Sequence, residues 1–390
     1  MWAILSDANG TPGSPGTTMV TAGARLLRSL ARAGKAQRRT VSKLVKNLFA
    51  KPAAKPKPPP PRIKPPPPRP GVGRPRVPAL PGKWLASHYS TLSELGTLPG
   101  RRMSYWLYLP DKAPSAATSR GGLPLIVMLH GCEQTATQFA QGTRMNRLAE
   151  HKGYALLYPQ QSLSMHARRC WKWYDKATQQ GGGGVKMIVG IIEQVAAKYA
   201  IDRSRIYICG ISAGAAMADI VALNHPQLIA AVGLHSGPVF GAVHSALGAL
   251  RVMQNGANGS AEGPIAEILD RNPAFPEMPT LLIQGAGDQV VRPINQSQLL
   301  QQSLLLNRLP RDSASTLSLN SPARGGSQNP AHAYAVRDFY AGRKLLLRVV
   351  HIEQLGHAWS GGDSAVPFTA KAGPDASKMM LDFFARHQRR

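Results

Sequence analysis

The 390-residue sequence is short of cysteine, aromatic residues, acidic residues and long apolar runs. Its three cysteines, Cys132, Cys170 and Cys209, exclude a disulfide-rich scaffold, and no CxxC pair among them indicates zinc or redox chemistry. No stretch approaches the roughly 18 consecutive apolar residues of a membrane span, so we expect no transmembrane segment. The apolar run from Met1 to Leu5 is shorter than the core of a secretory signal, which predicts a cytoplasmic protein with an extracellular location as the alternative.

Acidic residues are scarce, since 20 Asp and Glu stand against 47 Lys and Arg, for a formal net charge of +27. The first 83 residues hold 17 basic residues and a single acid, so most of this charge belongs to an N-terminal arm. Apolar residues make up 43% of the chain, enough for a sizeable core in the remainder. We therefore divide the sequence into a basic arm (1–50), a proline-rich linker (51–83) and a body (84–390).

The arm and linker favour placement on a surface over base recognition. Residues 19–50 combine apolar residues at helical spacing with Arg and Lys, a pattern typical of amphipathic helices on anionic or lipid-coated surfaces. Positions 52–81 hold 14 of the 33 prolines, which predicts an extended spacer. The arm lacks the interleaved aromatics of nucleic-acid-binding segments. A solvated, partly disordered tail is the alternative, and the composition leaves either Met1 or Met19 as the natural start.

The body alternates short apolar strands with helices. We expect strands over Tyr105 to Leu109, Leu123 to Leu129, Tyr154 to Tyr158, Arg205 to Cys209, Ile229 to Leu234, Thr280 to Gln284 and Leu345 to Ile352. We expect helices over Gln138 to His151, Val185 to Tyr199, Ala213 to Asn224, Ile294 to Leu306 and Ala376 to Arg386. Such alternation predicts an α/β fold whose mainly parallel sheet is covered by helices on both faces. Ligand chemistry in such sheets lies at the carboxyl ends of the strands.

Three of these strand ends carry residues suited to nucleophilic catalysis. The segment Gly210 to Gly214 places Ser212 between two glycines at a strand-to-helix turn, which exposes the hydroxyl; a plain glycine-rich turn is the alternative. Asp288 and His357 follow later strands, in the chain order that such turns use. Serine needs an imidazole to take its proton and a carboxylate to orient that imidazole. We therefore predict Ser212 as nucleophile, His357 as general base and then acid, and Asp288 as its orienter.

Other residues compete for the same roles. His130, His235 and His351 also lie near strand ends, and Asp175 and Asp363 are alternative acids. The combined order and placement favour Asp288 and His357 over these five.

The segment from Leu129 to Cys132 follows another apolar strand. A His-Gly turn at this place commonly presents a backbone N–H to a developing oxyanion, together with the N–H that follows the nucleophile. We predict the N–H groups of Cys132 and Ala213 as these donors. Losing one such donor typically costs ~10²–10³ in turnover.

These segments, with Cys170 to Tyr174 and Gly356 to Gly362, resemble the esterase family of short-chain polyhydroxybutyrate (PHB) depolymerases and related feruloyl and acetylxylan esterases. The resemblance spans about positions 105 to 385. It implies an α/β-hydrolase fold, ester hydrolysis through an acyl-enzyme, no metal and no organic cofactor. It also implies a disulfide between Cys132 and Cys170, which a reducing cytoplasm would oppose.

The leading hypothesis is a serine esterase for poly(3-hydroxybutyrate) or its oligomers, held near a granule by the arm. A feruloyl or acetylxylan-type carboxylesterase is the alternative, and a non-catalytic surface- or nucleic-acid-binding protein is the alternative of another class. Trp171, Trp173 and Trp359 either line the substrate groove or are ordinary core aromatics. The polar stretches 252–276 and 309–335 either cover the site or form surface loops.

Overall fold

The computed structural model describes residues 80–92, 99–111, 121–310, 315–320 and 333–389. Contacts divide the chain into one unit at Met1–Arg69 and another at Pro70–Arg390, and all described residues belong to the second. The basic arm and nearly all of the proline-rich linker lie outside the described residues. The three-part division of the chain therefore stays a prediction.

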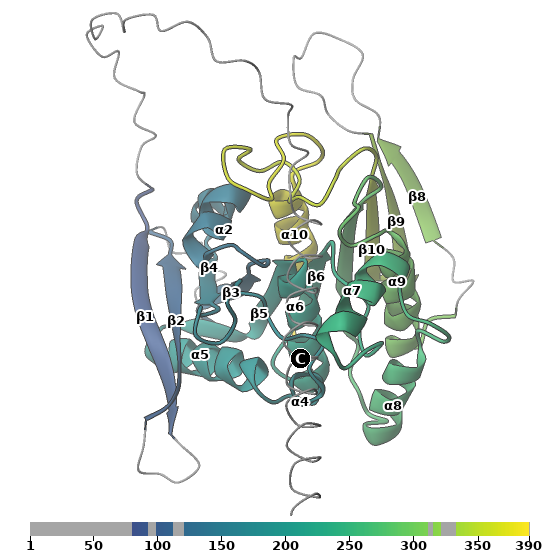
Figure 1. Ribbon diagram of the computed structural model, residues 1–390. Coiled ribbons are helices and arrows are strands. Elements are labelled where there is room, and N and C mark those ends of the chain that lie inside the picture. Colours follow the sequence, from purple (N-terminus) through teal and green to yellow (C-terminus); the bar gives the residue numbers. More distant parts are fainter. Residues whose placement is uncertain (1–79, 93–98, 112–120, 311–314, 321–332, 390) are drawn as a thin grey trace, which may run out of the picture. The chain divides into compact units, whose positions relative to one another are not determined.

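The described residues form a ten-stranded sheet in the order β1-β2-β4-β3-β5-β6-β7-β10-β9-β8 (Figure 1). Its strands are β1 (Lys83–Leu92), β2 (Pro99–Leu109), β3 (Leu123–Leu129), β4 (Ala155–Gln160), β5 (Ile201–Ile211), β6 (Ala231–His235), β7 (Thr280–Gly285), β8 (Ser315–Asn320), β9 (Tyr334–Ala341) and β10 (Lys344–Ile352). The run from β4 to β10 in this order is parallel, whereas both edges are antiparallel. The prediction of a mainly parallel sheet is confirmed.

Helices cover both faces of this sheet. One face carries α2 (Ala136–Thr143), α3 (Met145–Lys152) and α10 (Ala376–Phe384). The other carries α5 (Gly184–Lys198), α6 (Ala213–Asn224), α7 (Ala246–Asn255), α8 (Gly263–Arg271) and α9 (Ile294–Leu306), and the short α4 (Lys176–Gln179) precedes α5. Alternate side chains of β3 pack into different cores. Leu125 and Val127 belong to the core between the sheet and α5, and Ile126 and Met128 belong to the core between the sheet and α10. A strand buried on both sides reads as a continuous apolar run, as β3 does.

The structure departs from the expected elements in three respects. Helices α4, α7 and α8 were not expected, and α8 lies within the polar stretch 252–276. The helix expected over Gln138 to His151 is split into α2 and α3, because Arg144 adopts a left-handed conformation with a φ of 56°. The edge strands β1, β8 and β9 were not expected. Strand β8 lies within the polar stretch 309–335, so part of that stretch extends the sheet.

Candidate active site

The carboxyl ends of four strands line up across the sheet. The register pairs Ile211 of β5 with His235 of β6, His235 with Ile283 of β7, and Ile283 with Val350 of β10. Ser212 follows the first of these residues directly. The segments carrying Asp288 and His357 leave the same edge from β7 and β10, so one end of the sheet gathers all three predicted catalytic residues.

The turn at Ser212 is strained and tightly packed. Ser212 has a φ of 57° and a ψ of −125°, and its backbone N–H donates to the carbonyl of His235 at 2.9 Å. A Cβ on Gly210 would lie 2.5 Å from the carbonyl carbon of Gly214, so the two glycines of the motif pack against each other. Positive φ at a non-glycine residue costs free energy and is typical of functional turns. This geometry is that of a nucleophile elbow.

Asp288 and His357 form a buried pair. The Nδ1 of His357 donates to Oδ2 of Asp288 at 2.8 Å, and Asp288 is fully buried. The same oxygen accepts from the amide of Gln284 at 3.1 Å, while Oδ1 accepts from the backbone N–H groups of Val290 and Val291, both at 2.9 Å. Four hydrogen bonds therefore fix the carboxylate, and its contact with Nδ1 leaves Nε2 of His357 for a proton acceptor role.

The charge state of Asp288 follows from these contacts. Burial by itself raises the pKa of this carboxyl, but the charge of His357 and the hydrogen bonds from His357, Val291 and Val290 outweigh it and lower the pKa below its usual range. Asp288 thus stays ionised at neutral pH. An ionised partner stabilises the imidazolium that forms when a histidine accepts a proton.

The segments that carry the acid and the histidine are joined by their backbones. The N–H of Ala286 donates to the carbonyl of Ile352 at 2.8 Å, and the N–H of Gly287 donates to that of Leu355 at 3.0 Å. A Cβ on Gly285 would stand only 2.2 Å from the carbonyl oxygen of Leu355, so glycine is required for this approach. The distance between Asp288 and His357 is therefore set by rigid backbone contacts.

His235 ends β6, the strand between β5, which leads to Ser212, and β7, which leads to Asp288. Its carbonyl accepts from Ser212, and burial, followed by the charge of His357, lowers the pKa of its side chain to about 3. His235 is thus neutral at physiological pH. Among the described residues no hydrogen bond joins the Ser212 hydroxyl to His357, and in unliganded enzymes such contacts are often longer than in substrate complexes.

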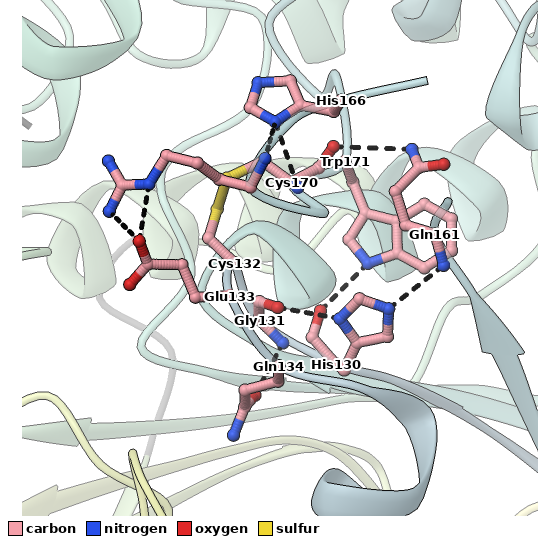
Figure 2. Close-up of a disulfide and its surroundings, with 10 residues drawn as sticks. His130, Gly131, Cys132, Glu133, Gln134, Gln161, His166, Cys170 and Trp171 are labelled. Carbon is pink, nitrogen blue, oxygen red and sulfur yellow. Dashed lines mark hydrogen bonds and ion pairs between the residues drawn. A yellow bond between two sulfur atoms is a disulfide. The ribbon is translucent and has the colours of Figure 1, made fainter. Parts of the chain in front are cut away.

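The loop after β3 is held by a buried histidine. Figure 2 shows His130 between two partners, with Nδ1 2.7 Å from the carbonyl of Gly131 and Nε2 accepting from the backbone N–H of Gln161 at 3.1 Å. The indole N–H of Trp171 donates to the carbonyl of His130 at 2.9 Å. These bonds join the loop after β3 to the segment after β4.

A covalent bond strengthens the same connection. Cys132 and Cys170, which are 38 positions apart in sequence, form a disulfide, drawn in yellow in Figure 2. Next to it, the backbone N–H of Glu133 donates to the carbonyl of Arg168 at 2.7 Å, and the two side chains form an ion pair at 2.6 Å. The remaining cysteine, Cys209, is buried in the core and is a free thiol.

The two predicted oxyanion donors are free in the described part of the chain. No described acceptor takes a hydrogen bond from the backbone N–H of Cys132 or Ala213. Ala213 is the first residue of α6, where the backbone N–H groups of a helix have no intrahelical partner. Both groups are consequently available to an incoming oxyanion.

Two glutamines support the site and were not predicted from the sequence. Gln134 is buried, accepts from the backbone N–H of Gly131 at 2.9 Å and donates to the carbonyl of Pro367 at 3.2 Å. Gln284 donates to Asp288 and, at 2.8 Å, to the carbonyl of Val291. Gln284 begins the turn that leads to Asp288, and Gln134 lies two residues beyond the segment Leu129 to Cys132, so nearness to the predicted site residues is the signal that singles them out.

The three tryptophans are buried in the two cores. Trp171 and Trp359 are fully buried and Trp173 is 5% exposed. The indole N–H of Trp359 donates to the hydroxyl of Ser377 at 3.1 Å. Their burial favours the alternative that they are core aromatics.

The competing residues have other roles in the structure. Asp175 caps α4 by accepting from the backbone N–H of Thr178 at 3.3 Å, and Asp363 accepts from the N–H of Ala365 at 3.1 Å. Among the described residues, His357 with Asp288 is the one histidine that forms an ion pair with a carboxylate. This contact distinguishes the proposed pair from its rivals.

We expect acid to destabilise the fold through His130. Burial lowers the pKa of this side chain from 6.5 to about 4, so the folded state favours neutral imidazole. Stability present above pH 6.5 should therefore be lost as the pH falls towards 4, by about 3 kcal/mol for this group alone. Denaturant unfolding at pH 7 and pH 4.5 measures the effect. His130→Gln should lose less stability over this interval than the wild type, whereas His244→Gln, at an exposed histidine, should lose as much.

The parallel sheet, the elbow at Ser212 and the acid and histidine on later strand ends define an α/β-hydrolase. A solved acetyl xylan esterase from Aspergillus awamori has the same fold, with a TM-score of 0.57 and 17% sequence identity over 77% of this chain and 99% of that one. At this identity the likeness concerns the fold alone.

The model of the family described as "Esterase PHB depolymerase" matches residues 103–316, and the chain belongs to this family. Poly(3-hydroxyalkanoate) depolymerase C of Paucimonas lemoignei is 28% identical over 214 residues, which are 54% of this chain and 50% of that protein. Feruloyl esterase B of Neurospora crassa is 34% identical over 134 residues, 34% of this chain and 43% of that protein. The chain spans about half the length of the curated relatives it matches.

Clusters of metal ligands and membrane-spanning helices are both absent from the described residues. The described part of the chain contains no group of three or more His, Cys, Asp or Glu side chains placed to hold a metal ion. None of its helices is both long and apolar enough to cross a membrane.

Proposed function

We propose that the protein is a serine esterase that hydrolyses poly(3-hydroxybutyrate) or its oligomers. The observation that carries the proposal is the buried contact between His357 and Asp288 on the sheet edge that also presents Ser212 in an elbow. Family membership supports ester hydrolysis as the reaction class.

In this mechanism Ser212 Oγ attacks the ester carbonyl as Nε2 of His357 takes its proton, which gives a tetrahedral oxyanion. The N–H groups of Cys132 and Ala213 donate to that oxyanion. Collapse breaks the ester bond, and His357 returns the proton to the leaving alcohol. Water then attacks the acyl-enzyme and loses a proton to His357. The second tetrahedral intermediate collapses as His357 returns that proton to Ser212 Oγ, which releases the acid and free Ser212.

The substrate class is supported by the depolymerase relative from Paucimonas lemoignei. A feruloyl or acetylxylan-type esterase is the second candidate, because relatives with those names match at 34% and 29% identity. Purified protein should release 3-hydroxybutyrate from amorphous polymer and from a trimer at a higher kcat/KM than it hydrolyses methyl ferulate or acetylated xylan. The reverse order would establish the second candidate instead.

A non-catalytic binding protein is the candidate of another class. A fluorophosphonate that labels active-site serines should modify the wild-type protein and leave Ser212→Ala unlabelled. Absence of labelling in the wild type would support the binding protein.

The basic arm has a proposed role in placement. Residues 19–50 bind a granule or another anionic surface, with residues 51–83 as spacer. Replacing Arg38, Arg39, Lys43 and Lys46 with glutamine in the full chain should lower the amount that sediments with amorphous granules by about tenfold, without changing hydrolysis of a soluble ester. Unchanged sedimentation would leave the arm as a solvated tail.

The disulfide bears on the compartment in which the protein is located. Disulfides persist in oxidising compartments and are rare in the cytosol, so the Cys132–Cys170 bond favours the extracellular alternative. Alkylation of the protein in denaturant as its own cells are lysed, followed by mass spectrometry, counts the cysteines that were free thiols. Three free thiols would favour the cytoplasm and one the outside.

A further inference from the structure

A cavity of about 150 Å³ lies at the carboxyl end of β4, and none of the three proposed catalytic residues is among its described lining residues. Its wall comes from the start of β2, the segment after β4, the region of Lys172 and the first turn of α5. Because β2 is antiparallel to β4, with Ser104 opposite Gln160, the first residues of β2 meet the carboxyl end of β4. The cavity therefore shares the sheet edge at which the catalytic residues gather.

Two residues of the wall lie on segments that adjoin the proposed site. Gln161 donates through its backbone to His130 and through its side-chain amide to the carbonyl of Cys170, at 3.4 Å. Met217 lies five residues after Ser212 on α6, about 7.5 Å along the helix axis. The cavity is therefore separated from the nucleophile by about one and a half turns of α6.

The rim of the cavity is cationic. Arg101, Arg102 and Lys172 line it, and none of them forms an ion pair with a described residue. The guanidinium of Arg101 lies against the first turn of α5, since a Cβ on Gly183 would stand 3.8 Å from its Nη1. Asp175 is the acid among the described lining residues, and its carboxylate is engaged by Thr178. The rim thus carries three cations against the one carboxylate of Asp175, which leaves a net positive charge.

The floor of the cavity is apolar. The dipole of helix α5 adds to the positive potential of the rim. Met103, Met187 and Met217 are buried and line the inner wall. Helix α5 begins at Gly184, and its N-cap residue Gly183 has no side chain to cap the helix. The positive end of the helix dipole therefore faces the cavity without a capping side chain. The cavity is therefore suited to a small anion attached to an apolar chain.

We propose that this cavity binds the free carboxylate end of a short hydroxyalkanoate oligomer, a proposal that rests on the proposed esterase function. The carboxylate forms charge-assisted hydrogen bonds with Arg101 and Lys172. The adaptable methionine side chains contact the alkyl groups of the next unit. Methyl ferulate and acetylated xylan carry no carboxylate, so the cavity selects acid-ended oligomers over neutral esters.

The binding test uses the full-length Ser212→Ala protein, which holds substrate without turning it over. Calorimetric titration should give an affinity for 3-hydroxybutyrate trimer about tenfold higher than for its methyl ester. Adding Arg101→Gln and Lys172→Gln should bring the affinity for the acid down to that for the ester. The matched control is Lys186→Gln, at an exposed cation on α5 outside the cavity, and it should change neither affinity.

Turnover by the protein with Ser212 intact separates this inference from the proposed function. Arg101→Gln with Lys172→Gln should raise KM for the acid trimer about tenfold with kcat unchanged, and leave the methyl ester unaffected. Equal binding of acid and ester, or binding of inorganic phosphate as tightly as the trimer, would overturn the assignment of the cavity. Carboxylate-dependent binding without hydrolysis of any ester would instead contradict the proposed function and support the cavity.

Discussion

Replacing Ser212 by alanine should lower kcat for ester hydrolysis by about 10⁴–10⁶-fold and leave the fold intact. The hydroxyl is the attacking atom in the proposed mechanism, and no neighbouring group supplies a substitute. Alanine keeps the Cβ of serine, so the strained φ of 57° costs the variant no more than it costs the wild type. Hydrolysis of p-nitrophenyl butyrate and thermal unfolding of the same preparation measure the two parts of this prediction.

The control for this variant is Ser303→Ala, which removes the hydroxyl of a buried serine on α9. Its activity should stay within about twofold of the wild type. If Ser212→Ala kept more than a tenth of the wild-type kcat, another residue would have to be the nucleophile.

Much of the site could be predicted because its residues follow apolar strands of ordinary length. Strand β7 is buried along its whole length and β5 over its last six residues, and β10 has a buried apolar run after its first residue and before half-buried Arg348 and His351. Such apolar runs are readable from the sequence. The carboxyl ends of parallel neighbours meet at one edge, so Ser212, Asp288 and His357 were expected together from their order alone. The structure brings the acid and the histidine into contact and places the serine on the same edge.

Other features depend on contacts between distant segments and could not be read locally. Gln134 reaches a carbonyl 233 residues further along, and nothing near it in the sequence identifies that partner. Strands β1 and β8 lie at the two edges of the described sheet. Side chains of β1 alternate between exposed and half-buried, and those described in β8 are all exposed, so neither strand has the continuous apolar run of a central strand. The helix breaks at Arg144 because this residue adopts a left-handed conformation. The apolar periodicity of the flanking residues does not predict that conformation.

Replacing Gly214 by alanine should lower the free energy of unfolding by more than about 4 kcal/mol, or prevent folding altogether. Intrinsic helix propensity alone would favour alanine by ~1 kcal/mol at this position inside α6. The end of β3 lies so close to Gly214 that alanine should destabilise the fold instead. A Cβ here would lie 2.1 Å from the carbonyl oxygen of Leu129 and 2.5 Å from that of His130, and backbone atoms at the end of a buried strand cannot move aside.

The same contact explains why the effect should reach activity as well as stability. Any shift that relieves the clash moves the end of β3, and with it the loop that carries the N–H of Cys132, away from Ala213. Denaturant unfolding and kcat for a soluble ester should therefore fall together. Gly263→Ala is the control, because this glycine is the first residue of α8 and a Cβ there meets nothing within 4 Å apart from its chain neighbours and its own helix. The following Pro264 disfavours a Cβ at this position, so the stability should change by less than about 1 kcal/mol in either direction. A Gly214→Ala protein with wild-type stability would contradict the close packing of α6 on β3, and with it the alignment of the two oxyanion donors.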